Sequence, residues 1–208
     1  MFPRTRITRS RGRLAFLLAV VAALATAGAA VATHVDSMMP TVNYHPSCID
    51  GSPGDPFCQT DNADLTIFRQ SSLTSTGKSN IAAMLNREYA PTDLAVIYAS
   101  TPSYSGGAET DIIYQQGTVP GTDTGLTWCN DAVSSTKCDQ HYNRFDSASP
   151  GQGIACHETG HAVGLTHGQQ AYPQLSNEDS SLACMKKSAS TSDLGTHNTN
   201  MINATYPN

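Results

Sequence analysis

The feature that most constrains this 208-residue chain is a short window, His157-Glu-Thr-Gly-His-Ala-Val-Gly-Leu-Thr-His167, which holds three of its seven histidines. His157 and His161 are four residues apart, so a helix places both imidazoles on one face, one turn apart. Two imidazoles in that arrangement can bind one metal ion, each through a nitrogen about 2.0–2.1 Å from a zinc. We therefore expect a helix that carries a metal site.

The residues that follow His161 predict a third ligand and a base. Glycine accepts a positive φ, so at Gly164 the chain can leave the helix and turn back. The return predicts His167 as the third ligand, and the fourth position of a zinc ion stays open for water. Glu158 projects from a neighbouring angle of the helix and can reach that water without binding the metal. The window thus predicts a site for Zn²⁺ with Glu158 as the catalytic residue.

The full pattern H-E-x-x-H-x-x-G-x-x-H is more specific than H-E-x-x-H, because the added Gly and His must also fall in register. It resembles the zinc signature of the metzincin metalloendopeptidases. The likeness is to matrixin-like and small secreted bacterial members. Snapalysin-type enzymes resemble this chain in size and export but carry Asp where this chain has His167. The resemblance implies a secreted zinc endopeptidase that hydrolyses peptide bonds with Glu158 as the base.

The same resemblance implies a fold and a role for Met185. The fold is of the α+β class: a twisted mixed sheet, a backing helix, the zinc helix, a Met-turn and a short C-terminal helix. In metzincins a Met-containing turn lies beneath the zinc histidines, and Met185 comes 18 residues after His167, a spacing consistent with that role. Some members have a Tyr two residues after this Met. Here the residue is Lys187, so no tyrosine ligand is expected.

Residues 1–32 predict a secretory signal peptide. Five arginines precede an apolar run from Leu14 to Leu24, and small residues continue to Ala32. The alternative is an uncleaved membrane anchor, but the apolar run is short for a spanning helix, which needs about 20 residues. We expect cleavage after Ala32, or after Ala29, and a secreted, extracellular protein without stable membrane association.

Removal of the leader makes the chain acidic. All 17 Asp and Glu residues follow Ala32, but only seven of the 12 Lys and Arg residues do, which gives the predicted mature chain a net charge of −10. An acidic surface disfavours nucleic acid and anionic membranes as partners. We expect a monomer. The resemblance implies a polypeptide substrate in an extended conformation, paired with an open edge strand of the sheet, and we assign that strand to Thr110–Gln115.

Six cysteines lie in the predicted mature chain, and an even number in an exported protein favours disulfides. Fifteen pairings are possible, so connectivity is a hypothesis. We predict that neighbours in the sequence pair: Cys48–Cys58, Cys129–Cys138 and Cys156–Cys184. The first two bonds close short local loops, and the third joins the residues that precede His157 and Met185.

The remaining chain divides at about residue 62. Pro and Gly residues between 33 and 62 exclude long helices and central strands. This segment is predicted to be either a short pro-region or an irregular N-terminal segment tied by the first disulfide. The catalytic domain is expected to span 63–208.

Apolar stretches predict five strands, at residues 64–69, 94–98, 110–115, 126–129 and 141–145, the last two as a hairpin. Helical periodicity predicts helices at 78–89 and 196–206. The nearly all-apolar strand 94–98 predicts burial on both faces. The zinc helix is expected to begin at a capping box, with Ser149 as N-cap, Pro150 as the first helical residue and Gln152 closing the box.

Some alternatives stay open at this point. Glu109 and Asp111 could join a structural Ca²⁺ site with nearby carbonyls, although no EF-hand spacing supports it. The protein could be a catalytically inactive metzincin-fold binding module, or a zinc hydrolase that acts on a cell-wall amide. Retention of Glu158 argues against the binding module, because a non-catalytic zinc site needs no base. The extended motif favours peptides over a cell-wall amide.

Overall fold

The structure is a computed structural model that describes residues 34–105 and 109–207. Val35–Asn208 forms one compact unit. The predicted signal peptide at residues 1–32 lies outside the described residues. Within the part of the chain that is described, no helix is long and apolar enough to cross a membrane.

A mixed, mostly parallel sheet forms the centre of the unit. Its main path has the order β1-β6-β4-β2-β3, where neighbours pair in parallel. The strands on this path are β1 (Gln59–Thr60), β6 (Lys137–Phe145), β4 (Ile112–Gln116), β2 (Asp64–Arg69) and β3 (Ala95–Tyr98). A sixth strand, β5 (Gly125–Ala132), runs antiparallel to β6, as the predicted hairpin requires. A mixed sheet with several helices agrees with the predicted α+β class.

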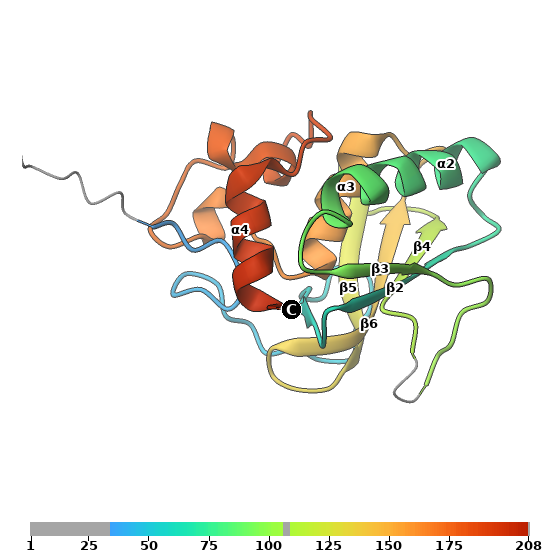
Figure 1. Cartoon of the computed structure of the whole chain (residues 1–208), viewed down its shortest axis with the longest axis horizontal. Helices are drawn as coiled ribbons and strands as arrows, with labels where there is room; N and C mark the ends of the chain where they lie inside the picture. The colour runs from blue at the N-terminus through green and yellow to red at the C-terminus, as the bar shows by residue number, and fades with distance from the viewer. Residues whose placement is uncertain (1–33, 106–108, 208) are drawn as a thin grey trace, which may run out of the picture. The chain divides into compact units, whose positions relative to one another are not determined.

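Two helices lie on the same side of the sheet, α2 (Ser75–Met84) and α3 (Gln152–Ala162) (Figure 1). A π-helical segment, η1 (Leu85–Tyr89), continues α2, so the helix predicted at 78–89 is present but begins earlier. The Thr74 side chain caps α2 by accepting a hydrogen bond from the Gly77 amide. The main core includes side chains of β2, β4, α2, η1 and α3: Leu65, Ile67, Ile112, Ile81, Met84, Tyr89, Ala155 and Ala162.

The C-terminal third continues from α3 through two short 3₁₀ helices into a last α-helix. The 3₁₀ helices are η2 (Gly168–Gln170) and η3 (Ser180–Met185), and the last helix is α4 (Gly195–Thr205). The predicted C-terminal helix is thus confirmed. Its expected packing residues are all buried: Met201, Ile202 and Tyr206.

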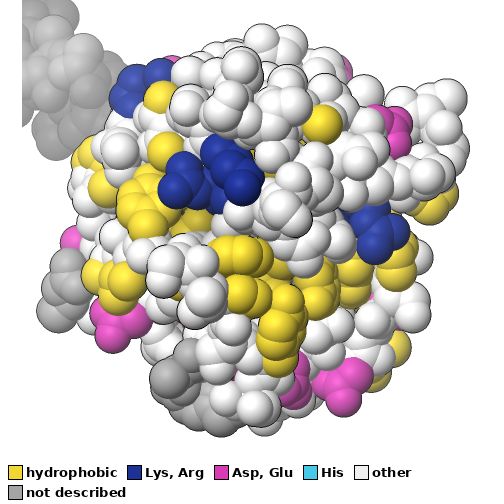
Figure 2. All heavy atoms as spheres, turned by 90° about the vertical axis from the view of Figure 1, so that its right-hand side faces the viewer, with side chains coloured by type: hydrophobic (Ala, Val, Ile, Leu, Met, Phe, Trp, Pro, Cys, Tyr) yellow, Lys and Arg dark blue, Asp and Glu magenta, His cyan; other side chains and the backbone are white. Residues whose placement is uncertain are grey.

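The prediction that strand 94–98 is buried on both faces is wrong. β3 is the outer strand of the sheet, next to β2, and Ile97 and Tyr98 are 46% and 38% exposed. The guanidinium of Arg69 covers the Tyr98 ring at 4.8 Å from its centroid. Figure 2 shows hydrophobic side chains exposed in a band on one face of the molecule, beside Lys and Arg side chains. A run of apolar residues does not by itself distinguish a buried strand from an edge strand that a cation covers.

The assignment of Thr110–Gln115 as an open edge strand is also wrong. β4 begins at Ile112 and lies between β2 and β6, with hydrogen-bonded partners on both sides. Both rows of its backbone polar groups face neighbouring strands, so it cannot pair with an added polypeptide.

The capping box predicted for the helix of His157 and His161 is absent. α3 begins at Gln152, and its N-cap is Gly151, which has no side chain to cap the helix. The Ser149 hydroxyl instead lies 2.6 Å from the Thr74 hydroxyl at the start of α2. A short polar residue near a helix start can serve a neighbouring helix, which the local pattern does not reveal.

The predicted disulfide connectivity is confirmed. The structure contains Cys48–Cys58, Cys129–Cys138 and Cys156–Cys184, and has no free cysteine among the described residues. The first two bonds pack together in a second core cluster with Met39 and Phe57. Three disulfides are compatible with an extracellular protein.

Tyr206, just after α4, provides a test of how the C-terminal helix is held. Its buried hydroxyl donates to the carbonyl of Val163, the C-cap of α3, at 2.9 Å. Tyr206→Phe leaves that carbonyl without this donor, so we expect the free energy of unfolding to fall by about 1–3 kcal/mol in urea titration. Tyr172→Phe is the control, because Tyr172 is 52% exposed. Equal effects of the two substitutions would contradict the assigned role.

Candidate metal centre

The helix α3 carries the first two predicted ligands on one face. His157 and His161 are each 6% exposed, and their Nε2 atoms lie 3.1 Å apart. After α3 the chain turns at Gly164, which has a φ of +98°. A Cβ at that position would also lie 2.7 Å from Cγ of Gln59, so both the backbone conformation and the packing require glycine.

The turn at Gly164 brings His167 back to the first two histidines. Its Nε2 lies 3.2 Å from that of His161 and 3.1 Å from that of His157. The three predicted ligands therefore meet at one point, and their ring nitrogens form a group that could hold a metal ion.

The other ring nitrogens of two histidines determine their tautomers. His157 Nδ1 lies 2.8 Å from the carbonyl of Cys184, and His161 Nδ1 lies 2.8 Å from the carbonyl of Leu165. A carbonyl only accepts, so each Nδ1 carries the proton and each Nε2 presents a lone pair. Two lone pairs 3.1 Å apart cannot hydrogen-bond to each other. A cation between them removes the repulsion, so the donor set fits a bound metal ion.

Burial also keeps these imidazoles in the neutral form that binds metals. It lowers the pKa of His157, and it lowers the pKa of His161 well below the usual value, with further lowering from the neighbouring histidines. Burial, followed by the proximity of His157, lowers the pKa of His167 to about 4.

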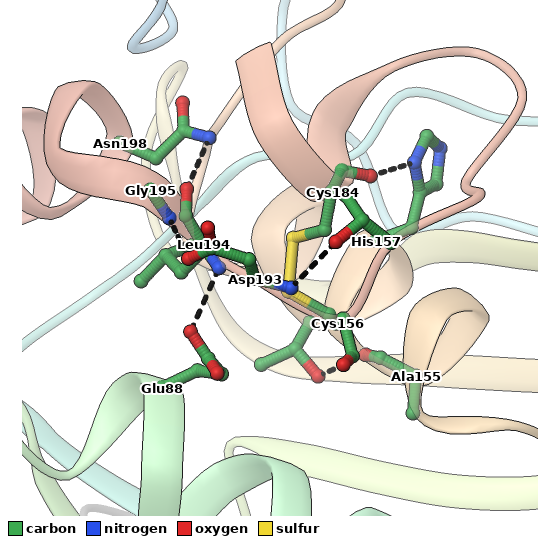
Figure 3. Close-up of a disulfide and its surroundings, with 12 residues drawn as sticks. Glu88, Ala155, Cys156, His157, Cys184, Asp193, Leu194, Gly195 and Asn198 are labelled. Carbon is green, nitrogen blue, oxygen red and sulfur yellow. Dashed lines mark hydrogen bonds between the residues drawn. A yellow bond between two sulfur atoms is a disulfide. The ribbon is translucent and has the colours of Figure 1, made fainter. Parts of the chain in front are cut away.

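The Cys156–Cys184 disulfide and Met185 hold the helix that carries His157 and His161. Cys156–Cys184 ties α3 to η3, and Figure 3 shows the His157 ring beside this bond, hydrogen-bonded to the Cys184 carbonyl. Met185 is fully buried, and a Cβ at Gly160 of α3 would lie 2.2 Å from its sulfur. Met185 thus packs directly against the backbone of the helix that carries His157 and His161.

Two tyrosines hold α3 against the rest of the core. The Tyr89 hydroxyl donates to the Cys156 carbonyl at 2.7 Å, and the Tyr114 hydroxyl lies 2.7 Å from Oγ1 of Thr159. Thr159 in turn donates to the carbonyl of Ala155. These bonds fix the helix that carries two of the three histidines, since buried polar groups that lose a partner cost free energy.

Glu158 lies against β5 rather than among the histidine nitrogens. Oγ1 of Thr127 is 2.7 Å from Glu158 Oε2, and a Cβ at Gly125 would lie 2.5 Å from Oε1. Burial raises the pKa of Glu158 to about 8, against the lowering effect of the Thr127 hydroxyl. A metal cation held by the histidines would lower this pKa, because a nearby positive charge favours the carboxylate.

The histidines and Glu158 line a cavity of about 530 Å³. Residues 122–127 form one part of its wall and residues 187–189 another. The N-terminal segment also contributes, through Tyr44 and Phe57. The Phe57 ring packs on the His161 imidazole with 4.3 Å between centroids, and Tyr44 stacks on Phe57.

Three of these contributors are not evident from the sequence. Gly125 and Thr127 support Glu158 from a strand about thirty residues earlier in the chain, and no local pattern connects them to it. Phe57 packs on a ligand from a segment expected to be irregular. Its one signal is its position beside Cys58, whose disulfide fixes the loop.

Comparison with models of known protein families found no match. A search of curated proteins also found no protein similar to this chain. The site therefore has to be interpreted from its own residues.

Removal of one histidine tests the centre. We expect His167→Ala to weaken binding of Zn²⁺, used as a probe, by more than about 100-fold, because two imidazoles remain where three converge. Competition calorimetry with a chelator of known affinity measures the change. His45→Ala, at an exposed histidine, is the control and should bind like the unmodified chain. Equal affinity of both variants would contradict the three-histidine site.

Proposed function

We propose that this protein is a secreted zinc-dependent endopeptidase of the metzincin type. The observation that carries the proposal is the convergence of three histidine Nε2 atoms, 3.1–3.2 Å apart, in a cavity that Glu158 also lines. A ligand set of three neutral imidazoles suits zinc and leaves a coordination position for water or substrate. A carboxylate beside that position is the group that peptide hydrolysis needs and that a purely structural metal site does not.

Features outside the ligand set support the metzincin assignment. The chain doubles back at Gly164 to supply the third histidine, and Met185 packs beneath the ligand helix. The sheet is mixed, as the resemblance of residues 157–167 implies, and its antiparallel strand β5 lies beside the cavity.

In this proposal Glu158 moves the proton. A zinc ion bound by the three histidines supplies Lewis acidity, which activates water and polarises a peptide carbonyl. Glu158 accepts the proton of the attacking water and then donates it to the leaving amine. The Thr127 hydroxyl holds Oε2 of the carboxylate, and Oε1 lies beside Gly125 on the strand that lines the cavity.

The backbone of β5 supports an extended polypeptide as the substrate. Alternate residues of an antiparallel strand direct their amides to opposite sides. On the side away from β6, the Cys129 amide and carbonyl bond to Pro56 and Gly51 of the N-terminal segment. Gly125 and Thr127 share that parity and line the cavity, so their amides and carbonyls are placed to pair with a substrate strand. β5 thus takes the role that the sequence had assigned to residues 110–115.

The direct test uses casein and the variant Glu158→Gln. We expect the purified mature protein to cleave casein, to lose activity in a chelator and to regain it with zinc. Glu158→Gln keeps the shape of the side chain but loses the base, so the rate should fall by about 10²–10⁴-fold while zinc stays bound.

Two outcomes would contradict the proposal. Full activity of Glu158→Gln would exclude Glu158 as the base. No cleavage of any polypeptide in a mixed peptide library by folded, zinc-loaded protein would favour a binding module or a cell-wall amidase instead.

A second prediction concerns Thr127, which acts through Glu158 as a positioning residue. Thr127→Val removes the hydroxyl at nearly constant volume, so we expect kcat to fall by about 10–100-fold with zinc still bound. Thr124→Val is the matched control, because Thr124 is exposed on the same wall of the cavity. An unchanged pH profile and kcat for Thr127→Val would contradict the assigned role of its hydroxyl.

A further inference from the structure

A second group of metal-ligating side chains lies where the parallel strands β2 and β4 begin. Asp61 comes just before β2, Asp111 just before β4, and Asp139 is in β6. These three carboxylates offer oxygen atoms that all lie within 4.8 Å of one another. None of these residues belongs to the histidine centre.

In the described part of the chain, no basic side chain forms an ion pair with these three carboxylates. In residues 34–105 and 109–207, the ion pair found within 4.0 Å joins Arg87 to Glu88 and involves none of these carboxylates. Lys137 is the nearby basic residue, but its Nζ donates to the backbone carbonyl of Asp61 at 2.6 Å. Three carboxylates so close together repel one another unless a cation or a proton lies among them.

Glu109 is a fourth acidic residue, which is buried and lies beside the cluster. It is only 6% exposed, and in the described part of the chain its carboxylate oxygens face the acidic groups of Asp131 and Asp139 and accept no hydrogen bond from an N–H or hydroxyl donor. Its carboxyl group lies beside those of Asp131 and Asp139, so it is directed at the same cluster. A buried carboxylate without a donor is costly, and a metal ion is the kind of partner that satisfies it.

We propose that Asp61, Asp111 and Asp139, with Glu109 beside them, form a binding site for one calcium ion. All the proposed ligands are carboxylate oxygens, which hard cations such as calcium prefer. The histidine centre instead offers nitrogen ligands, which suit zinc. Oxygens on opposite sides of a calcium ion are separated by about 4.6–5.2 Å, which accommodates the observed spacing. Magnesium demands a smaller and more regular shell.

The ion would join parts of the chain that are distant in sequence. Asp111 already accepts hydrogen bonds from the Thr66 amide and, at 3.3 Å, from the Thr60 hydroxyl. Asp61 follows directly after β1 and the Cys48–Cys58 disulfide, and Phe57 of that segment packs on His161. Calcium at the cluster therefore stabilises the sheet and the wall of the histidine cavity, whatever reaction the cavity serves.

The experiment uses the mature protein, stripped of metal and reloaded with one equivalent of zinc. Calcium chloride is titrated by calorimetry, and Tm is measured with and without calcium. We expect one calcium per chain and a rise in Tm of about 5 °C or more at 100 times the Kd. Magnesium chloride, titrated in parallel, should bind more weakly.

The decisive variant is Asp139→Asn, with Asp64→Asn as the control at an exposed carboxylate that starts β2. Asp139→Asn should bind calcium at least tenfold more weakly and keep its zinc. Its calcium-free Tm should not fall, because one repelling charge is removed. Glu109→Gln should behave in the same way and gives a second variant if the first does not fold.

The proposal is overturned if the unmodified protein binds no calcium or binds magnesium more tightly. It is also overturned if Asp139→Asn and Glu109→Gln bind calcium like Asp64→Asn. A loss of calcium-free stability with unchanged calcium affinity would show that the cluster is part of the fold and not a metal site.

Discussion

Three imidazole nitrogens that lie 3.1–3.2 Å from one another, two on buried rings and one on a half-buried ring, define what the rest of this structure has to support. Because the Nδ1 atoms of His157 and His161 face carbonyls, their Nε2 lone pairs point at a common centre. A cation at that centre removes the repulsion between these two lone pairs. The helix, the glycine turn at 164 and the loop that ends at Met185 all serve to keep it in place.

The support comes from several directions and from distant parts of the sequence. The Cys156–Cys184 bond fixes the carbonyl that orients His157, while Met185 packs against Gly160. Phe57 of the N-terminal segment also packs on His161. Contacts of this kind fix ligand orientation and basicity, and their loss typically weakens metal affinity or activity by about 10–100-fold.

Glu158 shows how the strand beside the cavity takes part in the site. Gly125 leaves room for the carboxylate, and Thr127 donates to it from the same strand. Gly125 and Thr127 of this strand also line the cavity. One short segment can therefore position the base and, in the proposed function, the substrate that the base acts on.

The sequence predicts the local features of the site well and the distant ones poorly. His157 and His161 share a helix face, and Gly164 permits the return of His167, so all three could be found within one window. The disulfides and the C-terminal helix were also predictable, from cysteine spacing and periodicity. Strand order was not, because the pairing of a strand depends on segments far away in the chain. Hence 110–115 was assigned to an edge that β5 occupies, and 94–98 to a buried position although β3 is an edge.

The supports of Glu158 could not be predicted for the same reason. No motif near Gly125 or Thr127 in the sequence indicates that this strand packs against a helix that begins at Gln152. The start of that helix was itself misplaced, because Ser149 bonds to Thr74 of another helix instead of capping its own. These contacts arise from packing between elements, which a local pattern does not encode.

The most direct test is a crystal structure of the zinc-loaded Glu158→Gln protein with a bound peptide, with diffraction recorded at the zinc absorption edge. The account predicts one anomalous peak about 2.0–2.1 Å from the Nε2 atoms of His157, His161 and His167. It also predicts a peptide that runs antiparallel to Gly125–Thr127, with a carbonyl near the peak. A peak elsewhere, or a peptide bound away from β5, would contradict it.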